Sequence, residues 1–84
     1  MATKPVNVTI AYCAECGYEP QTLALTGALM KRFGYRLSVI EVIPWHDGTF
    51  DVSVAGELVH SMMCDGGVPE HETVFAAVNE RLGN

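Results

Sequence analysis

The sequence is poor in charge and poorer still in positive charge. Only 18% of its 84 residues are charged, and five Lys and Arg stand against ten Asp and Glu, for a net charge of -5. Proteins that bind nucleic acids or anionic membranes present a basic surface, so we expect neither kind of partner. With 49% hydrophobic residues, the chain is long enough for one domain, residues 1–84, and too short for two.

The sequence also lacks long apolar runs and an even set of cysteines. No run approaches the roughly 20 residues of a membrane span, and alternating residues after Lys4 do not resemble a signal peptide. Three cysteines are an odd number for a secreted disulfide framework, and two of them are separated by only two residues. We therefore expect a reducing cytoplasm, where a close cysteine pair is typical of redox or metal chemistry.

Hydrophobic periodicity predicts the element order β-α-β-β-β-α. The predicted strands are 6–12, 37–43, 50–54 and 57–61, and the predicted helices are 19–33 and about 69–82. The apolar segment 37–43 is typical of a central, covered strand, and Pro44 is expected to end it. A strand-helix-strand unit requires a parallel pair, to which the hairpin adds antiparallel strands. We therefore predict an α/β fold with two layers, in which two helices cover a mixed sheet.

Cys13 and Cys16 lie between the first predicted strand and the first predicted helix. Free N–H groups and the positive end of a helix dipole stabilise a thiolate, which is the reactive form of cysteine. Two intervening residues allow reversible disulfide formation, in which one thiol attacks and the other resolves. This placement is typical of thioredoxin-like redox proteins. Glu15 brings a carboxylate between the cysteines and is expected to raise the pKa of a neighbouring thiol.

Zinc binding is the main alternative for a C-x-x-C pair, because structural zinc takes four ligands. Cys64 with His60 or His71 would have to complete a Cys₃His site. The sequence holds no second C-x-x-C pair, and His60 falls within a predicted strand. These observations favour redox chemistry over a metal site, with an inert pair as the remaining alternative.

Four further residues are weaker candidates for tuning the thiols or contacting a partner. Tyr18 flanks the pair and is placed to shield it. Trp45 with Phe50 either anchors the core, which is favoured, or forms an apolar rim on which a partner docks. His60 is expected to be structural, with tuning of the thiols as the alternative. Cys64 is expected to be packed or superficial, with glutathionylation, soft-metal binding and a third redox thiol as alternatives.

Two stretches of the sequence carry a family resemblance. They are Tyr12-Cys13-x-x-Cys16-Gly17-Tyr18-x-Pro20 and Phe50-x-Val52-x-Val54-x-Gly56-x-Leu58-Val59-His60-Ser61. Together they resemble the selenoprotein W group of the Rdx family, the first as its redox site and the second as its hairpin signature. Asp65-Gly66 followed by a terminal helix also fits, so the resemblance covers essentially the whole chain.

The resemblance implies a thioredoxin-like fold and a thiol-disulfide redox function that uses Cys13 and Cys16. It implies protein thiols or glutathione as partners, with glutathione a co-substrate and no bound cofactor. The selenocysteine of this family falls on the second position of the pair, here Cys16, whereas thioredoxins attack with the first, here Cys13. Thioredoxins also place a cis-proline just before the hairpin strand, where this sequence has Asp47-Gly48-Thr49. A redox-sensitive protein-binding module without turnover is the alternative function.

Overall fold

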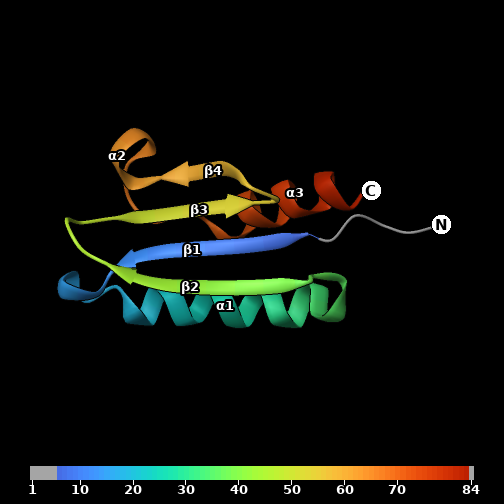
Figure 1. Ribbon diagram of the computed structural model, residues 1–84, viewed down its shortest axis with the longest axis horizontal. Helices are drawn as coiled ribbons and strands as arrows, with labels where there is room; N and C mark the ends of the chain where they lie inside the picture. The colour runs from blue at the N-terminus through green and yellow to red at the C-terminus, as the bar shows by residue number, and fades with distance from the viewer. Residues whose placement is uncertain (1–5, 84) are drawn as a thin grey trace.

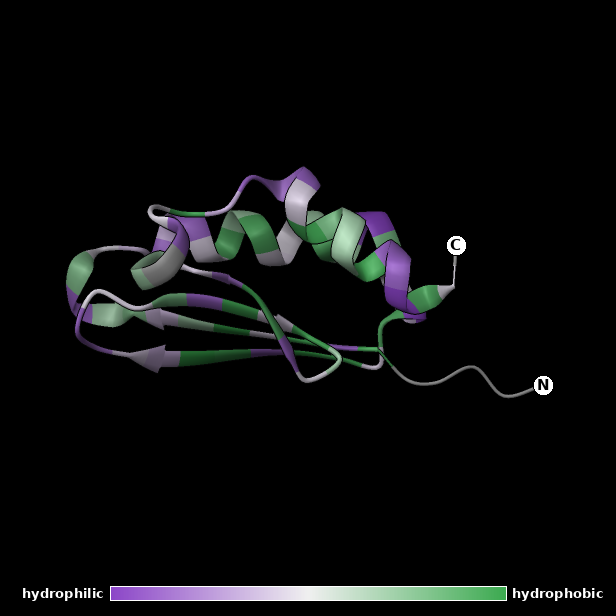
Figure 2. Ribbon diagram, turned by 90° about the horizontal axis from the view of Figure 1, so that it is seen from above, coloured by the Kyte–Doolittle hydropathy of each residue, from purple (hydrophilic) through white to green (hydrophobic). Residues whose placement is uncertain are grey.

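The protein folds into a four-stranded sheet with two long helices on one face (Figures 1 and 2). The computed structural model describes residues 6–83 and, for Cys64, the backbone only. The strands are β1 (Asn7–Cys13), β2 (Val39–Trp45), β3 (Phe50–Val54) and β4 (Glu57–Ser61). The helices are α1 (Glu19–Phe33), α2 (Met62–Asp65) and α3 (His71–Leu82), with short 3-10 helices η1 (Ala14–Cys16) and η2 (Gly34–Arg36).

The sheet has the strand order β2-β1-β3-β4 and is mixed. β1 pairs in parallel with β2 and antiparallel with β3, and β3 pairs antiparallel with β4. The connection from β1 to β2 runs through α1, as a parallel pair requires. The two-layer α/β arrangement predicted from the sequence is thus confirmed, with α1 and α3 on the same side (Figure 2).

The helix α1 begins and ends where its sequence indicates. Pro20 lies in the first turn, where its missing N–H removes no hydrogen bond. Leu25, Leu29 and Phe33 recur every four residues and are buried against the sheet. Gly34 ends the helix with a positive φ of 54°, a conformation that costs glycine little.

The hydrophobic core lies between this helical layer and the two central strands. Alternate residues of a strand point to the same face, so the apolar positions of β1 and β3 line the core together. The fully buried side chains of these strands and of α3 are Val8, Ile10, Cys13, Phe50, Val52, Val54, Val74 and Val78. The core therefore depends on β1 and β3 as the centre of the sheet.

β2 corrects two predictions made from the sequence. It is an edge strand rather than a central covered one, and Val39, Val42 and Trp45 are exposed. It also continues through Pro44, which pairs with Tyr12. An edge strand needs backbone partners on one side only, so a residue without an N–H can be accommodated there. Glu41 accordingly lies exposed and accepts a hydrogen bond from Thr9 Oγ1 at 3.3 Å.

The segment after β4 is more ordered than predicted. The predicted strand 57–61 and the predicted helix at about 69–82 leave this segment without regular structure, but Met62–Asp65 form the single turn of α2. The carboxylate of Asp65 reaches back to the start of this turn and accepts a hydrogen bond from Ser61 N at 2.9 Å. α3 then begins at His71, two residues later than predicted, after the extended Glu70. No helix in residues 6–83 is long and apolar enough to span a bilayer.

Candidate functional site

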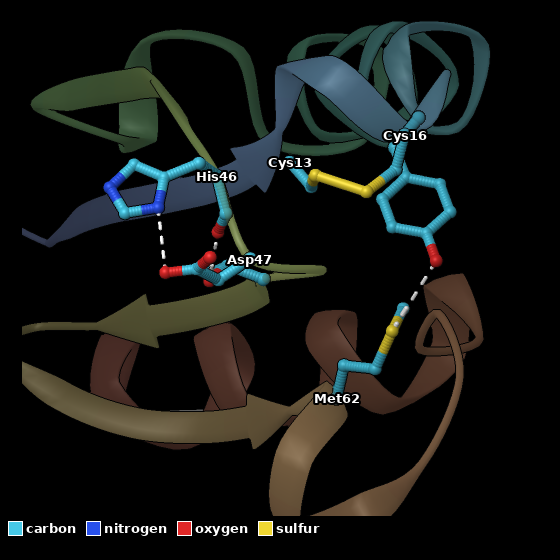
Figure 3. Close-up of a disulfide and its surroundings, with 7 residues drawn as sticks. Cys13, Cys16, His46, Asp47 and Met62 are labelled. Atoms are coloured by element: carbon cyan, nitrogen blue, oxygen red, sulfur yellow. Dashed lines mark hydrogen bonds and ion pairs between the residues drawn. A yellow bond between two sulfur atoms is a disulfide. The ribbon is translucent and has the colours of Figure 1, made fainter.

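Cys13 and Cys16 form a disulfide at one end of the sheet (Figure 3). Cys13 is the last residue of β1, and η1 turns the chain so that the Cα atoms of the two cysteines lie 5.4 Å apart. That separation is ordinary for a disulfide. Gly17 follows with φ at 78°, which allows the chain to leave η1 and enter α1. The strand-turn-helix placement expected for the pair is present.

The two cysteines differ sharply in exposure. Cys13 is 1% exposed, whereas Cys16 is an exposed residue at the end of η1. Cys13 N donates a hydrogen bond to Thr49 O at 2.7 Å, so the residue before β3 secures the end of β1. A reagent arriving from solvent therefore meets Cys16 first. Thr49, rather than a proline, is the residue directly before β3.

Tyr18 joins the disulfide segment to the core and to α2. Its ring packs edge-on against Phe50 with 6.1 Å between ring centroids. Its hydroxyl donates a hydrogen bond to Met62 Sδ at 3.5 Å, a contact between residues 44 positions apart (Figure 3). Tyr18 thus lies beside the pair as expected, and the sequence carries no signal for its contact with Met62.

The turn between β2 and β3 forms the other side of the site. His46 Nδ1 lies 2.7 Å from Asp47 Oδ2, and Thr49 Oγ1 donates to His46 O at 2.8 Å. Trp45 stacks on His46 with 4.8 Å between ring centroids and is 53% exposed. The favoured prediction that Trp45 anchors the core is therefore wrong. The same prediction is confirmed for Phe50, which is fully buried in the core, whereas Trp45 lies at the end of an edge strand.

His60 and Cys64 lie on the elements that follow the hairpin. His60 is buried, and its Nε2 is 2.7 Å from Gly67 O. A carbonyl only accepts hydrogen bonds, so Nε2 carries the proton and holds the glycine loop to β4. This geometry is the structural role expected of His60. Cys64 lies in α2, and its alternatives stay predictions because its side chain is outside the described part.

The zinc alternative stays a prediction, because the side chain of Cys64, its third ligand, lies outside the described part. Within residues 6–83, excluding the side chain of Cys64, no three or more His, Cys, Asp and Glu side chains cluster as metal ligands would. His60, one of the ligands considered from the sequence, already donates from Nε2 to Gly67 O. The pair itself lies at disulfide distance, which favours redox chemistry.

Four acidic residues lie on the segments at this end of the sheet. Glu15 is exposed within η1, Glu19 lies in the first turn of α1, Asp47 is in the turn beside the disulfide, and Asp65 ends α2. The sequence indicates Glu15, because it lies between the cysteines. It carries no such signal for Asp47 and Asp65, because only the pairing of the strands brings their loops to this end of the sheet.

The family comparison covers nearly the whole described chain. The model of the Rdx family matches residues 7–80. Selenoprotein W of Ovis aries is 39% identical over 71 residues, covering 83% of this chain and 82% of that protein. Migration and invasion enhancer 1 of Bos taurus is 30% identical over 73 residues, covering 87% of this chain and 62% of that protein.

Solved structures share the same architecture. A protein from Bordetella parapertussis superposes with a TM-score of 0.87 at 25% identity, covering 94% of this chain and 100% of that one. A selenoprotein W-related protein from Vibrio cholerae superposes with a TM-score of 0.88 at 20% identity, covering 94% and 99% respectively. The mixed sheet, its covering helices and these neighbours together agree with the thioredoxin-like fold predicted from the sequence.

Proposed function

Because this chain belongs to the Rdx family, we propose that it is a thiol-disulfide redox protein that cycles Cys13 and Cys16 between dithiol and disulfide. Its partners are protein thiols or glutathione as co-substrate, and its setting is a reducing cytoplasm. The observation that carries the proposal is a pair at disulfide distance with one buried and one exposed cysteine. In such a pair the exposed cysteine can attack a partner, and the buried cysteine can resolve the mixed disulfide.

We assign the attacking role to Cys16 because it is the accessible cysteine. In the reduced protein, the Cys16 thiolate attacks one sulfur of a partner disulfide, forms a mixed disulfide and releases the first partner thiolate, which takes up a proton. Cys13, as its thiolate, then attacks Cys16 Sγ, closes the internal disulfide and releases the second partner thiolate. Two electrons pass to the partner, and the two protons lost by the cysteines balance the two thiols formed.

Trapping of mixed disulfides tests this assignment. In a Cys64→Ser background, Cys13→Ser retains the exposed thiol and is expected to accumulate mixed disulfides with partner proteins or glutathione. Cys16→Ser, the matched control, is expected to accumulate far fewer because its remaining thiol is buried. The assignment fails if Cys16→Ser traps more. The redox function fails if neither variant traps a partner and the parent does not exchange with a small disulfide.

A redox-sensitive binding module is the second candidate function. The contact between Tyr18 and Met62 supports it, since this contact links the disulfide segment to α2. The exposed Trp45 beside the same segment offers a docking side chain. Partner affinity that follows the redox state without turnover of a dithiol reductant would favour this function over electron transfer.

A further inference from the structure

The described cations are confined to one end of the long axis of the molecule. The described Lys and Arg residues lie in the last turns of α1 and α3 and in η2, namely Lys31, Arg32, Arg36 and Arg81. These elements end at the side of the molecule opposite η1 and α2 (Figure 1). The disulfide end instead carries Glu15, Glu19, Asp47 and Asp65, which are all exposed.

The distant cations do not neutralise the disulfide end. α1 has 15 residues, so it separates its first turn from its last by about 20 Å at 1.5 Å per residue. That distance is roughly twice the Debye length at physiological salt, which is about 8 Å. Arg81 is in addition paired with Glu57 and Glu80 at its own end. A charged reagent approaching Cys16 therefore meets mainly the field of the nearby carboxylates.

We propose that the acidic surface around Cys16 selects a cationic partner, namely a protein cysteine flanked by Lys or Arg, over an anionic one such as glutathione. This inference rests on the proposed redox function and narrows its partner class. The exposed side chains of Trp45 and Met63, 53% and 82% accessible, add apolar contact area for a protein partner beside the carboxylates.

The acidic surface affects both the rate at which a partner encounters Cys16 and the stability of the mixed disulfide that forms. Opposite charges raise the rate at which two reactive groups meet, and like charges lower it. In the mixed disulfide the partner's flanking residues lie next to Glu15 and Asp47, so a basic residue gains an ion pair and an acidic one meets repulsion. The electron balance is unchanged: the protein dithiol is oxidised to a disulfide as the partner disulfide is reduced to two thiols.

The test compares three small disulfides of different charge. Reduced Cys64→Ser protein reacts with cystamine, which is cationic, with oxidised glutathione, which is anionic, and with neutral hydroxyethyl disulfide. Each rate is divided by the rate of 2-mercaptoethanol with the same disulfide, which removes differences in leaving group. We expect the normalised ratio of cystamine to oxidised glutathione to be about tenfold or more at low salt, and to fall several-fold at 0.5 M salt.

Two double variants test which carboxylates cause the preference for the cationic disulfide. Glu15→Gln with Asp47→Asn removes two carboxylates from the disulfide end and should lower the normalised ratio at least threefold. Glu57→Gln with Glu80→Gln changes the net charge equally at the far end and should leave the ratio unchanged. A shift in thiolate fraction affects both disulfides alike and cancels in the ratio.

The outcomes separate this inference from the function on which it rests. A normalised ratio near one, or a preference for oxidised glutathione, overturns the cationic partner while leaving the redox function intact, provided that hydroxyethyl disulfide is reduced. Equal effects of the two double variants also overturn it. If the reduced protein reacts with none of the three disulfides, the proposed redox function itself is wrong.

Discussion

The two cysteines of the pair lie in different environments although only Ala14 and Glu15 separate them. Cys13 ends a central strand and is 1% exposed, while Cys16 ends a 3-10 turn and is exposed. Glu15 is the charged side chain nearest to both in sequence, and it is exposed to solvent. The reactivity of the exposed thiol is therefore sensitive to a single neighbouring charge.

Replacing Glu15 with Gln should lower the pKa of the Cys16 thiol. A carboxylate beside a thiolate disfavours the charged form, and a unit charge several ångströms away in water contributes somewhat under 1 kcal/mol. We expect a downward shift and therefore faster alkylation at neutral pH. The measurement is the pH dependence of iodoacetamide alkylation with Cys16 as the sole cysteine, in a Cys13→Ser/Cys64→Ser background. Glu80→Gln is the control, and an upward shift in Glu15→Gln would contradict the expected influence of this carboxylate.

Phe50 shows how closely the site is tied to the core. Its side chain is fully buried and its ring meets that of Tyr18, which follows the disulfide segment. Phe50→Ala should reduce the free energy of unfolding by about 3–5 kcal/mol, the usual cost of removing a buried phenyl ring. Urea denaturation measures this loss, and Trp45→Ala is the matched exposed aromatic, expected to cost under 1 kcal/mol. Equal losses in the two variants would mean that the burial of Phe50 does not set its contribution.

At the scale of elements, the site is assembled by the ends of β1, β2 and β4 and the start of β3. The turn before β3 holds Cys13 through Thr49 O, and α2 reaches the disulfide segment through Met62 and Tyr18. α2 is only four residues long, so its position depends on its anchors more than on its own helical hydrogen bonds. One of these anchors is the hydrogen bond between His60 and Gly67 just beyond it.

His60→Ala should loosen this segment and reduce the free energy of unfolding by about 1–3 kcal/mol, through the lost hydrogen bond and lost packing. His60→Gln keeps an N–H donor on a side chain of similar reach and should recover part of the loss. Urea denaturation measures the stability, and limited proteolysis reports on the Gly66-Gly67 loop. An alanine variant as stable and as resistant to protease as the parent would refute the anchoring role.

For the whole molecule, the disulfide is peripheral to the core that holds the fold. The buried hydrophobic cluster joins β1, β3, α1 and α3, and the ring closed by the disulfide spans a sequence separation of only three. Chain-entropy arguments give so short a ring about 2 kcal/mol of stabilisation, which is less than the 5–15 kcal/mol typical of folded domains. The protein should therefore stay folded in both redox states.

Reduction should lower the free energy of unfolding by about 2 kcal/mol or less without unfolding the chain. Denaturation with and without dithiothreitol measures the difference. Cys13→Ala with Cys16→Ala is the control and should be insensitive to the reductant. Unfolding of the parent on reduction would show that the disulfide is structural and would argue against a redox cycle.

Local sequence patterns specify the elements whose hydrophobic periodicity is strong and the cysteine pair whose spacing is short. The alternation in β1 and β3, the four-residue repeat of Leu25, Leu29 and Phe33, and the C-x-x-C spacing are properties of neighbouring residues. The sequence does not specify that β2 lies at the sheet edge, because a strand that is apolar on both faces is expected at the centre of a sheet. The exposure of Trp45 follows from that edge position.

Which cysteine faces solvent, and which distant residues lie at the same end of the sheet, depends on tertiary packing. Cys13 and Cys16 look alike in the sequence, but the end of a central strand buries one and a turn exposes the other. Asp47, Met62 and Asp65 reach the site because strand pairing brings three chain turns to one end of the sheet. Local patterns specify elements, whereas contacts between residues far apart in sequence arise only when those elements pack. The distribution of the few positive charges also depends on packing. The described Lys and Arg residues lie at one end of the fold, and the disulfide end is acidic.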